Sequence, residues 1–191
     1  MEALSDGVVP ATGETYEMIQ NESRRLSRLV DDLQRLSRAE SGQESVDLTV
    51  IRLSPFLDRI KMKLKPQFLE KNVSLQTDAK PPELELTTDE DKLDQVLVNL
   101  LDNALRYTEE GGTVSVTCRE AGGQFELQVN DDGRGIAAEH LPHIFERFYR
   151  ADKSRSREEG GSGIGLTIVK RYVEALGGEI KVESGVRKGT S

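Results

Sequence analysis

Residues 91–108 read DKLDQVLVNLLDNALRYT, a stretch that contains neither proline nor glycine. Apolar residues recur in it at steps of three and four, which is the spacing of one face of an α-helix. We therefore expect a long helix whose apolar stripe packs on a core, with strands elsewhere in the chain supplying the opposite layer. The predicted stripe consists of Leu93, Leu97, Leu100 and Ala104.

A second, polar face runs beside this stripe. Asn99, Asn103 and Arg106 lie at positions i, i+4 and i+7 and so share one side of the helix. Asparagine is a modest helix former, so two of them aligned with an arginine beside a buried stripe favour a polar site. An asparagine carbonyl oxygen can ligate Mg²⁺, and an arginine can face a phosphate. A solvated polar face is the alternative, and these residues alone leave both readings open.

Outside this helix, short alternating apolar segments predict strands. A hairpin is expected where residues 114–118 and 125–129 alternate on either side of the Ala-Gly-Gly turn at 121–123. Strands and helices mix without strict alternation, which predicts an α+β fold: a two-layer α/β sandwich with helices on one face of a mostly antiparallel mixed sheet. Further strands are predicted at 46–50, 73–75, 84–86 and 180–182.

Capping and breaking residues mark the predicted ends of helices. Ser54 and Pro55 predict a helix start, with a capping hydroxyl followed by proline at the first helical position. Pro66 should kink or interrupt that helix. Thr88 predicts the cap of the long helix, which should run to about Tyr107.

The N-terminal part of the chain predicts a helical arm. Residues 14–40 contain no proline or glycine, and their apolar side chains form a narrow seam with a repeat of seven. At 1.5 Å per residue this helix would be roughly 40 Å long, and the seam needs another helix against it. We favour a helical hairpin or dimer arm over a helix folded back on its own domain. The seam consists of Ile19, Leu26, Leu29, Leu33 and Leu36.

The composition of the 191 residues is that of a soluble globular protein, with 36% hydrophobic and 31% charged residues. A net charge of −8 argues against nucleic acid as a partner, because phosphate backbones attract basic surfaces. The single Cys118 excludes an internal disulfide and alternates with valines as a buried strand residue does. No apolar run approaches the length that spans a bilayer, and no signal peptide opens the chain.

A second motif, VNDDGRGI at 129–136, directly follows a predicted strand. An ionised carboxylate only accepts hydrogen bonds, so Asp131 can select the amino group of adenine and would repel the carbonyl oxygen of guanine. Gly133 and Gly135 would let the base approach the backbone. The alternative is an acidic turn, which aspartate and glycine commonly form.

The glycine-rich stretch EEGGSGIGL at 158–166 leads into a helix predicted at 165–176. Glycines let the backbone approach a phosphate, and a helix start offers unpaired N–H groups. It is not a P-loop, because Leu166 stands where lysine is needed, and the glycine spacing does not fit the dinucleotide fingerprint. A phosphate-facing lid is favoured over a flexible linker. His140 and His143 have no carboxylate or cysteine at ligand spacing, so we expect structural or surface histidines.

Four motifs, in this order, resemble the catalytic ATP-binding domain of bacterial sensor histidine kinases, in the gyrase-like ATPase superfamily. The resemblance implies a Bergerat-type ATP-binding fold for residues 43–191. ESRRLSRLVDDLQRLSRAESG resembles the second helix of the family's dimerisation hairpin, so 1–42 is expected to be a remnant of that hairpin. The four motifs are NLLDNALRYT at 99–108, NDDGRGI at 130–136, IFERFYR at 144–150 and GGSGIGL at 160–166.

Carried over position by position, the resemblance implies a Mg·ATP site. Asn103 would bind Mg²⁺, with Asn99 in support. Arg106 would contact the phosphates and Tyr107 would lie beside the nucleotide. Asp131 would hold the adenine amino group. The other implied residues are Gly133, Gly135 and Ile136 of the pocket, Arg150 near the phosphates, Gly161, Ser162, Gly163, Gly165 and Leu166 of the lid, Thr190, and the lid anchors Phe145 and Phe148.

The implied activity is transfer of the γ-phosphoryl group of ATP to a histidine on the hairpin, and onward to an aspartate of a response regulator. In the family that histidine sits in a motif like HELRTP, which this sequence lacks, so self-phosphorylation is not expected. The parent protein would be a homodimeric membrane sensor, with this part on the cytoplasmic side of the bacterial inner membrane. Gly189 and Thr190 resemble the start of the family's closing strand, which would be truncated here.

Two other functions stay open. A gyrase-like ATP hydrolase activates water with a glutamate, and Asn99 stands in that place here, so hydrolysis should be slow because an amide cannot take the proton. A non-catalytic nucleotide-binding or docking module is the other alternative, although such a module has no obvious use for the heptad arm.

Overall fold

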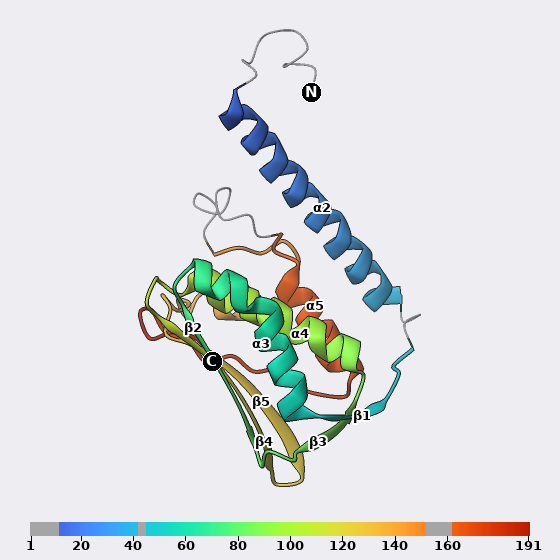
Figure 1. Ribbon diagram of the computed structural model, residues 1–191. Coiled ribbons are helices and arrows are strands. Elements are labelled where there is room, and N and C mark those ends of the chain that lie inside the picture. The colour runs from blue at the N-terminus through green and yellow to red at the C-terminus, as the bar shows by residue number, and fades with distance from the viewer. Residues whose placement is uncertain (1–11, 42–44, 152–161) are drawn as a thin grey trace.

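The computed structural model describes residues 12–41, 45–151 and 162–191 and confirms the predicted α+β, two-layer fold (Figure 1). A long helix stands on a domain in which the remaining helices cover one face of a small sheet. The helices are α2 (Gly13–Ser41), α3 (Leu53–Glu70), α4 (Glu90–Tyr107) and α5 (Gly165–Ala175), with a 3₁₀ turn at Leu141–His143. The strands are β1 (Thr49–Arg52), β2 (Ser74–Lys80), β3 (Glu85–Thr88), β4 (Thr113–Ala121) and β5 (Gln124–Asp131).

The central strand of the main sheet is β4, which pairs parallel with β2 and antiparallel with β5. A separate antiparallel pair is formed by β1 and β3. The predicted hairpin is confirmed, with Val116 opposite Val129 and Cys118 opposite Leu127. Its turn residues Gly122 and Gly123 have φ of 62° and 75°. Positive φ at both positions is the backbone that a two-residue type I′ turn requires.

The main core lies between α3, α4 and the inner face of the sheet. On β4, Val114, Val116 and Cys118 are buried, as the two-residue period of a strand requires. In α4 the buried stripe includes Leu101, while Leu100 is half-buried and faces a second cluster toward α5. The assignment of Leu100 to the core stripe is therefore wrong. Because α4 packs on two sides, one apolar period could not describe both of its faces.

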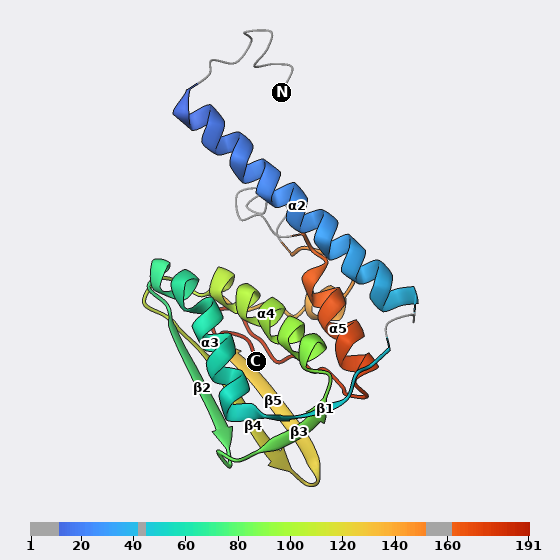
Figure 2. The same cartoon turned by 45° about the vertical axis from the view of Figure 1, so that its right-hand side comes forward.

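The second cluster joins α4, α5 and the end of α2 (Figure 2). Leu36 is only 4% exposed, so the last turns of α2 pack against the domain, while the rest of the helix projects away from it (Figure 1). Further up the helix, Leu26, Val30 and Leu33 are 53%, 52% and 46% exposed. The predicted arm helix is confirmed, and its central apolar residues stay open to another helix. Its role in dimerisation remains a prediction.

The first strand and the first helix of the domain do not begin where the sequence predicts. The first strand begins at Thr49, and Ile51 is its buried residue. Helix α3 begins at Leu53, and the hydroxyl of Ser54 donates 2.8 Å to the carbonyl of Pro82. The predicted capping role of Ser54 is therefore wrong, because the hydroxyl bonds to a segment distant in sequence.

Helix α4 is capped by Asp89, one residue after the predicted Thr88. The Asp89 carboxylate accepts a 3.0 Å hydrogen bond from the backbone N–H of Lys92. In α3, the helix continues through Pro66 to its end, so the predicted interruption is wrong. Met62 and Pro66 are both exposed, which leaves the carbonyl group that loses its helical partner on the solvent side.

The strand predicted at 180–182 is not a regular strand. Glu183 and Ser191 exchange two backbone hydrogen bonds of 2.8 Å. Thr190 pairs on its other side with Asp131, at the end of β5. Thr190 therefore lies beside the end of β5 as an isolated bridge, and its assignment to a closing strand stays an expectation of the family resemblance.

Candidate nucleotide-binding site

The residues predicted for the site come from three parts of the fold. Asn99 and Asn103 lie on α4, Asp131 ends β5, and Gly165 begins α5. Helices α4 and α5 lie side by side on the same face of the sheet (Figures 1 and 2). All of these residues are half-buried. The polar face of α4 therefore meets the start of the helix that follows the glycine-rich stretch.

Asn99 is the side chain of this group with a buried polar atom that lacks a partner in the described part of the chain. Its Nδ2 group is buried and has no hydrogen-bond partner among the residues that the structure describes. A buried donor without a partner costs about 1–3 kcal/mol. A Cβ atom on Gly165 would lie 3.6 Å from Asn99 Oδ1, so the amide faces the first residue of α5. Helix α5 has no side-chain N-cap, and its first N–H groups open at the same place.

Asp131 is held at the end of β5 by backbone pairing with Thr190. Its Oδ1 accepts a 3.0 Å hydrogen bond from the N–H of Gly133. Burial raises the pKa of the Asp131 carboxyl; hydrogen bonds from the N–H groups of Gly133 and Thr190 oppose this rise, and the charge of Asp132 adds to it. The structure thus brings Thr190 next to Asp131.

The neighbouring Asp132 has a different role. Both of its carboxylate oxygens accept hydrogen bonds from the N–H of Thr113, at 2.9 and 3.0 Å. A Cβ on Gly112 would lie 2.6 Å from the same carboxylate, so the start of β4 packs closely against it. Asp132 therefore ties the end of β5 to the start of β4, which leaves Asp131 as the aspartate of the candidate site.

Gly133 and Gly135 are required by the packing of the chain on itself. A Cβ on Gly133 would lie 2.4 Å from the carbonyl oxygen of Tyr107, and one on Gly135 would lie 1.9 Å from that of Gly185. The N–H of the next residue, Ile136, donates 2.8 Å to the hydroxyl of Ser184. The glycines therefore seat residues 131–136 between the end of α4 and the turn at 184–189.

The C-terminal end of α4 borders a cavity of about 320 Å³. The backbone N–H of Arg134 donates 3.2 Å to the carbonyl of Tyr107, and the Arg134 guanidinium lies 4.5 Å from the centre of the Tyr107 ring. Arg106 also lines this cavity, and three of its lining side chains are cationic. The lining residues are Lys71, Arg106, Tyr107, Thr108, Glu109, Glu110 and Arg134.

The segment around IFERFYR is fastened to the start of α5. The N–H of Phe148 donates 2.9 Å to the carbonyl of Gly163, and the Thr167 hydroxyl donates 3.0 Å to the carbonyl of Phe145. The Phe148 side chain itself is 59% exposed, so its contact is made by backbone. Ser162 Oγ accepts a 3.2 Å bond from the N–H of Ile164.

Leu166 and Gly161 belong to the predicted lid, and Arg150 is predicted to lie near the phosphates. Leu166 and Arg150 are half-buried, the first in the opening turn of α5 and the second at the end of the IFERFYR segment. Gly161 lies outside the described residues.

Both histidines bond within their own segment. His140 Nδ1 lies 2.8 Å from the hydroxyl of Tyr149. His143 Nδ1 lies 2.7 Å from a carboxylate oxygen of Glu146, its neighbour three residues on. Both contacts are local, which agrees with a structural role in this segment.

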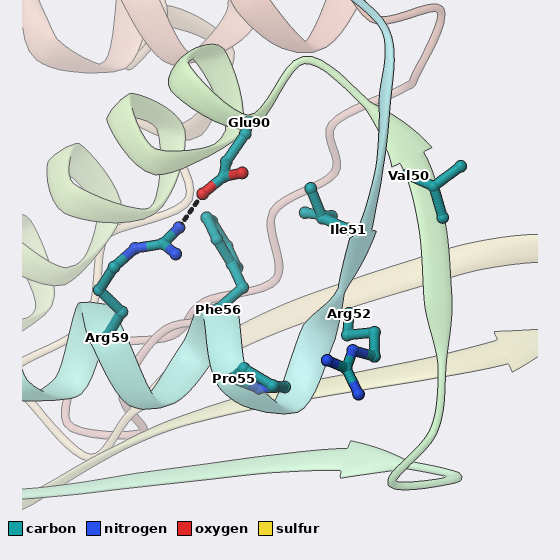
Figure 3. Close-up of a pocket in the computed structure, with 7 residues that line it drawn as sticks. All are labelled: Val50, Ile51, Arg52, Pro55, Phe56, Arg59 and Glu90. Atoms are coloured by element: carbon teal, nitrogen blue, oxygen red, sulfur yellow. Dashed lines mark hydrogen bonds and ion pairs between the residues drawn. The ribbon is translucent and has the colours of Figure 1, made fainter.

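A second cavity, of about 190 Å³, lies at the opposite end of the α3–α4 pair (Figure 3). Arg59 and Glu90 form an ion pair at its edge, and the Arg59 guanidinium lies 5.2 Å from the centre of the Phe56 ring. No residue of the predicted site lines this cavity.

Two negative findings concern the described residues only. They contain no group of three histidine, cysteine or carboxylate side chains that could hold a metal ion. They also contain no helix that is both long and apolar enough to cross a bilayer.

Lys71 and Arg134 lie at the end of α4 and received no role from the sequence. Arg134 stands inside the quoted NDDGRGI motif, so attention to that motif could have found it. Lys71 belongs to the end of α3, and no local pattern connects it with α4.

Comparison with known proteins places the chain among ATPases. Residues 88–191 match the family described as Histidine kinase-, DNA gyrase B-, and HSP90-like ATPase. Sensor protein SrrB of Staphylococcus aureus is 38% identical over 193 residues, which cover all of this chain and 33% of SrrB. The chain thus spans about a third of the length of the curated relatives it matches.

Solved structures agree with this placement. Histidine kinase AdeS of Acinetobacter baumannii superposes with a TM-score of 0.80 at 24% identity, over 99% of this chain and 87% of AdeS. Full-length ShkA in complex with AMPPNP superposes with a TM-score of 0.80 at 28% identity, over 95% of this chain and 38% of ShkA. With a family match that covers more than half of its residues, the chain belongs to the histidine kinase-, DNA gyrase B- and HSP90-like ATPases.

Proposed function

We propose that this chain binds ATP with Mg²⁺ and presents the γ-phosphoryl group to a histidine on a dimerisation hairpin. One observation carries the proposal: α5 begins without a side-chain cap directly against the amide of Asn99, whose Nδ2 group is buried and has no hydrogen-bond partner among the described residues. An uncapped helix start has unpaired N–H groups and the positive end of the helix dipole, both of which suit phosphate.

Asp131 would recognise the base. A carboxylate only accepts hydrogen bonds, so it favours the amino group of adenine over the carbonyl oxygen of guanine. Because Asp131 is half-buried and its pKa is raised by burial, an added donor would relieve part of its desolvation. Gly133, Gly135 and Ile136 would act through the loop that they seat against α4 rather than through direct chemistry.

Asn103 would hold Mg²⁺, with Asn99 in support. The described residues offer amide oxygens here and no carboxylate cluster, which fits an ion that takes most of its ligands from water and phosphate. When bound, Mg²⁺ neutralises charge on the phosphate oxygens. Arg106 and Arg150 would add positive charge, and the segment at 162–166 would lie against the phosphates.

The chain would contribute positioning and charge neutralisation to the transfer. A nitrogen of the hairpin histidine would form a bond to the γ-phosphorus as the bond to ADP breaks. An aspartate of a response regulator would then accept the phosphoryl group. The hairpin, the homodimer and the membrane-bound parent protein rest on the family resemblance.

The first test is a calorimetric titration with Mg²⁺ and a non-hydrolysable ATP analogue, beside the matching GTP analogue. We expect adenine-selective binding that Asp131→Asn weakens about ten- to hundredfold, since a hydrogen bond to a charged group contributes about 1.5–3 kcal/mol. Asn103→Ala should remove the Mg²⁺ dependence of binding. A folded protein that does not bind the analogue would refute the proposal. Steady phosphate release that survives Asn103→Ala would contradict the site assignment.

A further inference from the structure

The last turn of α4 ends without a glycine cap, and its carbonyl groups are satisfied in an unusual way. The final four carbonyls of a helix have no partner within it. Here the N–H of Thr108 donates 3.0 Å to the carbonyl of Ala104, and the N–H of Arg134 donates 3.2 Å to that of Tyr107. Lys71 Nζ donates to the two that remain, at 2.7 Å to Leu105 and 2.8 Å to Arg106.

Lys71 belongs to a series of cations that reach from α3 to α4. Arg59 pairs with Glu90 and Lys63 pairs with Asp94, so the two helices run in the same direction. Arg59 and Lys63 are exposed and their partners Glu90 and Asp94 are half-buried, and ion pairs of this kind near the surface contribute little to stability. Lys71 differs, because it is half-buried and bonds to backbone at the negative end of the helix dipole.

The turn that Lys71 holds carries the proposed phosphate and nucleotide contacts, Arg106 and Tyr107. The same turn is packed from the other side by the adenine loop, where Gly133 approaches the Tyr107 carbonyl and Arg134 bonds to it. Fraying of this turn would therefore move Arg106 and Tyr107 and loosen the seat of residues 131–136 at the same time.

We propose that Lys71 is a positioning residue for the nucleotide site: its ammonium group replaces a C-cap on α4 and fixes Arg106 and Tyr107 for binding. This inference rests on the proposed function. Lys71 acts through the backbone of α4: its ammonium group has enough N–H donors for both carbonyls, and its positive charge lies at the negative end of the helix dipole.

The test compares Lys71→Met, Lys71→Arg and the matched control Lys63→Met in the same chain. We expect Lys71→Met to raise the Kd of the Mg²⁺–ATP analogue about tenfold and to speed hydrogen exchange at the amides of residues 105–108. Lys71→Arg keeps the charge and several donors, so it should bring the Kd back to within about threefold of the parent protein. Lys63→Met removes a contact between the same helices and should leave Kd and exchange unchanged.

The outcomes separate this inference from the proposed function. If the parent chain binds the analogue and Lys71→Met binds it equally well, the positioning role is refuted and the proposed function stands. If Lys71→Met melts below the assay temperature, the titration is repeated beside the parent chain at a lower temperature at which the variant is folded, and an unchanged Kd there also refutes the role. If the parent chain does not bind, the proposed function fails, and this role fails with it.

Discussion

Asp131 and Asp132 are adjacent in sequence but have different contacts, because β5 ends at Asp131 and Asp132 is the first residue after it. Asp132 turns its carboxylate to the N–H of Thr113 and joins two strands. Asp131 stays half-buried beside Gly133 and Thr190. The motif NDDGRGI does not by itself say which aspartate is tied to the sheet, since that depends on the start of β4.

Asp131→Asn should keep the fold and change its pH dependence. Burial raises the folded-state pKa of Asp131, so the native state binds this proton more tightly than the unfolded chain does. The free energy of unfolding therefore falls as pH rises from the unfolded value of 3.8 through the folded pKa. At neutral pH we expect Asp131→Asn to be as stable as the parent chain or more stable by up to about 1 kcal/mol, measured by urea unfolding at acidic and neutral pH.

Asp132→Asn is the matched comparison for that experiment. It weakens two hydrogen bonds to Thr113 and should lower the free energy of unfolding by about 1 kcal/mol. A larger loss of stability in Asp131→Asn than in Asp132→Asn would reverse the roles assigned to the two residues.

Two glycines of the site should respond differently to alanine. At Gly165 the new Cβ lies in ordinary contact with Asn99, 3.6 Å from Oδ1, so Gly165→Ala at the first position of α5 should fold with a free energy of unfolding within about 0.5 kcal/mol of the parent chain. The same methyl group occupies the space in front of the amide and should weaken binding of the ATP analogue. Gly133→Ala meets the Tyr107 carbonyl at 2.4 Å and should lose about 1–3 kcal/mol. Calorimetry measures binding of the ATP analogue to both variants, and urea unfolding measures their stability. If both variants bind the analogue as tightly as the parent chain does, the site assignment is contradicted.

At the scale of elements, α4 is fixed at both ends by side chains that the helix periodicity does not reveal. Its first turn is capped by Asp89 and its last turn is bonded by Lys71. Between these ends it packs on the sheet with one side and on α5 with another. Helix α4 therefore packs against both the loop at 131–136 and α5, and it fixes their positions relative to each other.

Asp89→Ala should test the cap. Burial acts to raise the pKa of Asp89, but hydrogen bonds from Lys92 and the N–H of Asp47, with the charge of Lys92, outweigh it and lower the pKa. The stabilising contribution is therefore present above the unfolded value of 3.8 and is lost as pH falls through the folded pKa. We expect Asp89→Ala to cost about 1–2 kcal/mol at neutral pH and less in acid. Thr88→Val is the control. If it lowers the free energy of unfolding as much as Asp89→Ala does, the N-cap of α4 would have to be assigned to Thr88.

Leu36→Ala should test the packing of α2 on α5. Leu36 is 4% exposed within the cluster that contains Ile168 and Tyr172, and truncating a buried leucine costs about 2–5 kcal/mol. Leu26→Ala, at a position 53% exposed, should stay within about 0.5 kcal/mol of the parent chain. Urea unfolding followed by circular dichroism measures both. Equal effects in the two variants would mean that the end of α2 is not held on α5.

At the scale of the whole molecule, the two cavities lie at opposite ends of the parallel helices α3 and α4. Their N-terminal ends border the small cavity closed by Arg59 and Glu90 (Figure 3). Their C-terminal ends border the larger cavity beside Tyr107. The candidate site and the cations that support it lie toward the second end, and α2 stands on the far side of α5 (Figure 1).

The exposed apolar residues of α2 should support association of two chains. Leu26, Val30 and Leu33 are about half exposed along a helix whose apolar repeat suits another helix. We expect a concentration-dependent dimer in sedimentation velocity, which Leu26→Glu shifts toward monomer without a change in ATP-analogue affinity. A monomer at every concentration would argue against this surface as the dimer contact, and an equal shift in a Met62→Glu control would make the effect non-specific.

Much of the fold could be predicted because its signals are short-range. The helix at 91–107, the arm helix and the β4–β5 hairpin each follow from a period or a turn that a few neighbouring residues define. The four motifs also placed the chain in its family. The wrong predictions lie mostly at the ends of helices, as with the caps predicted at Ser54 and Thr88. At such positions a side-chain oxygen can bond to any of several neighbouring groups.

The sequence by itself determined the order of helices and strands, the family and the residue types at the candidate site. Only the tertiary structure decided which apolar face each helix buries and that Leu101, not Leu100, belongs to the main core. It also decided that the end of α2 packs against α5 through Leu36. The hydrogen bonds from the Lys71 ammonium group to the carbonyls of Leu105 and Arg106 likewise depend on the tertiary structure. The physical reason is that periodicity and capping act between neighbours in the chain, whereas these contacts join segments distant in sequence and form only when the layers pack together.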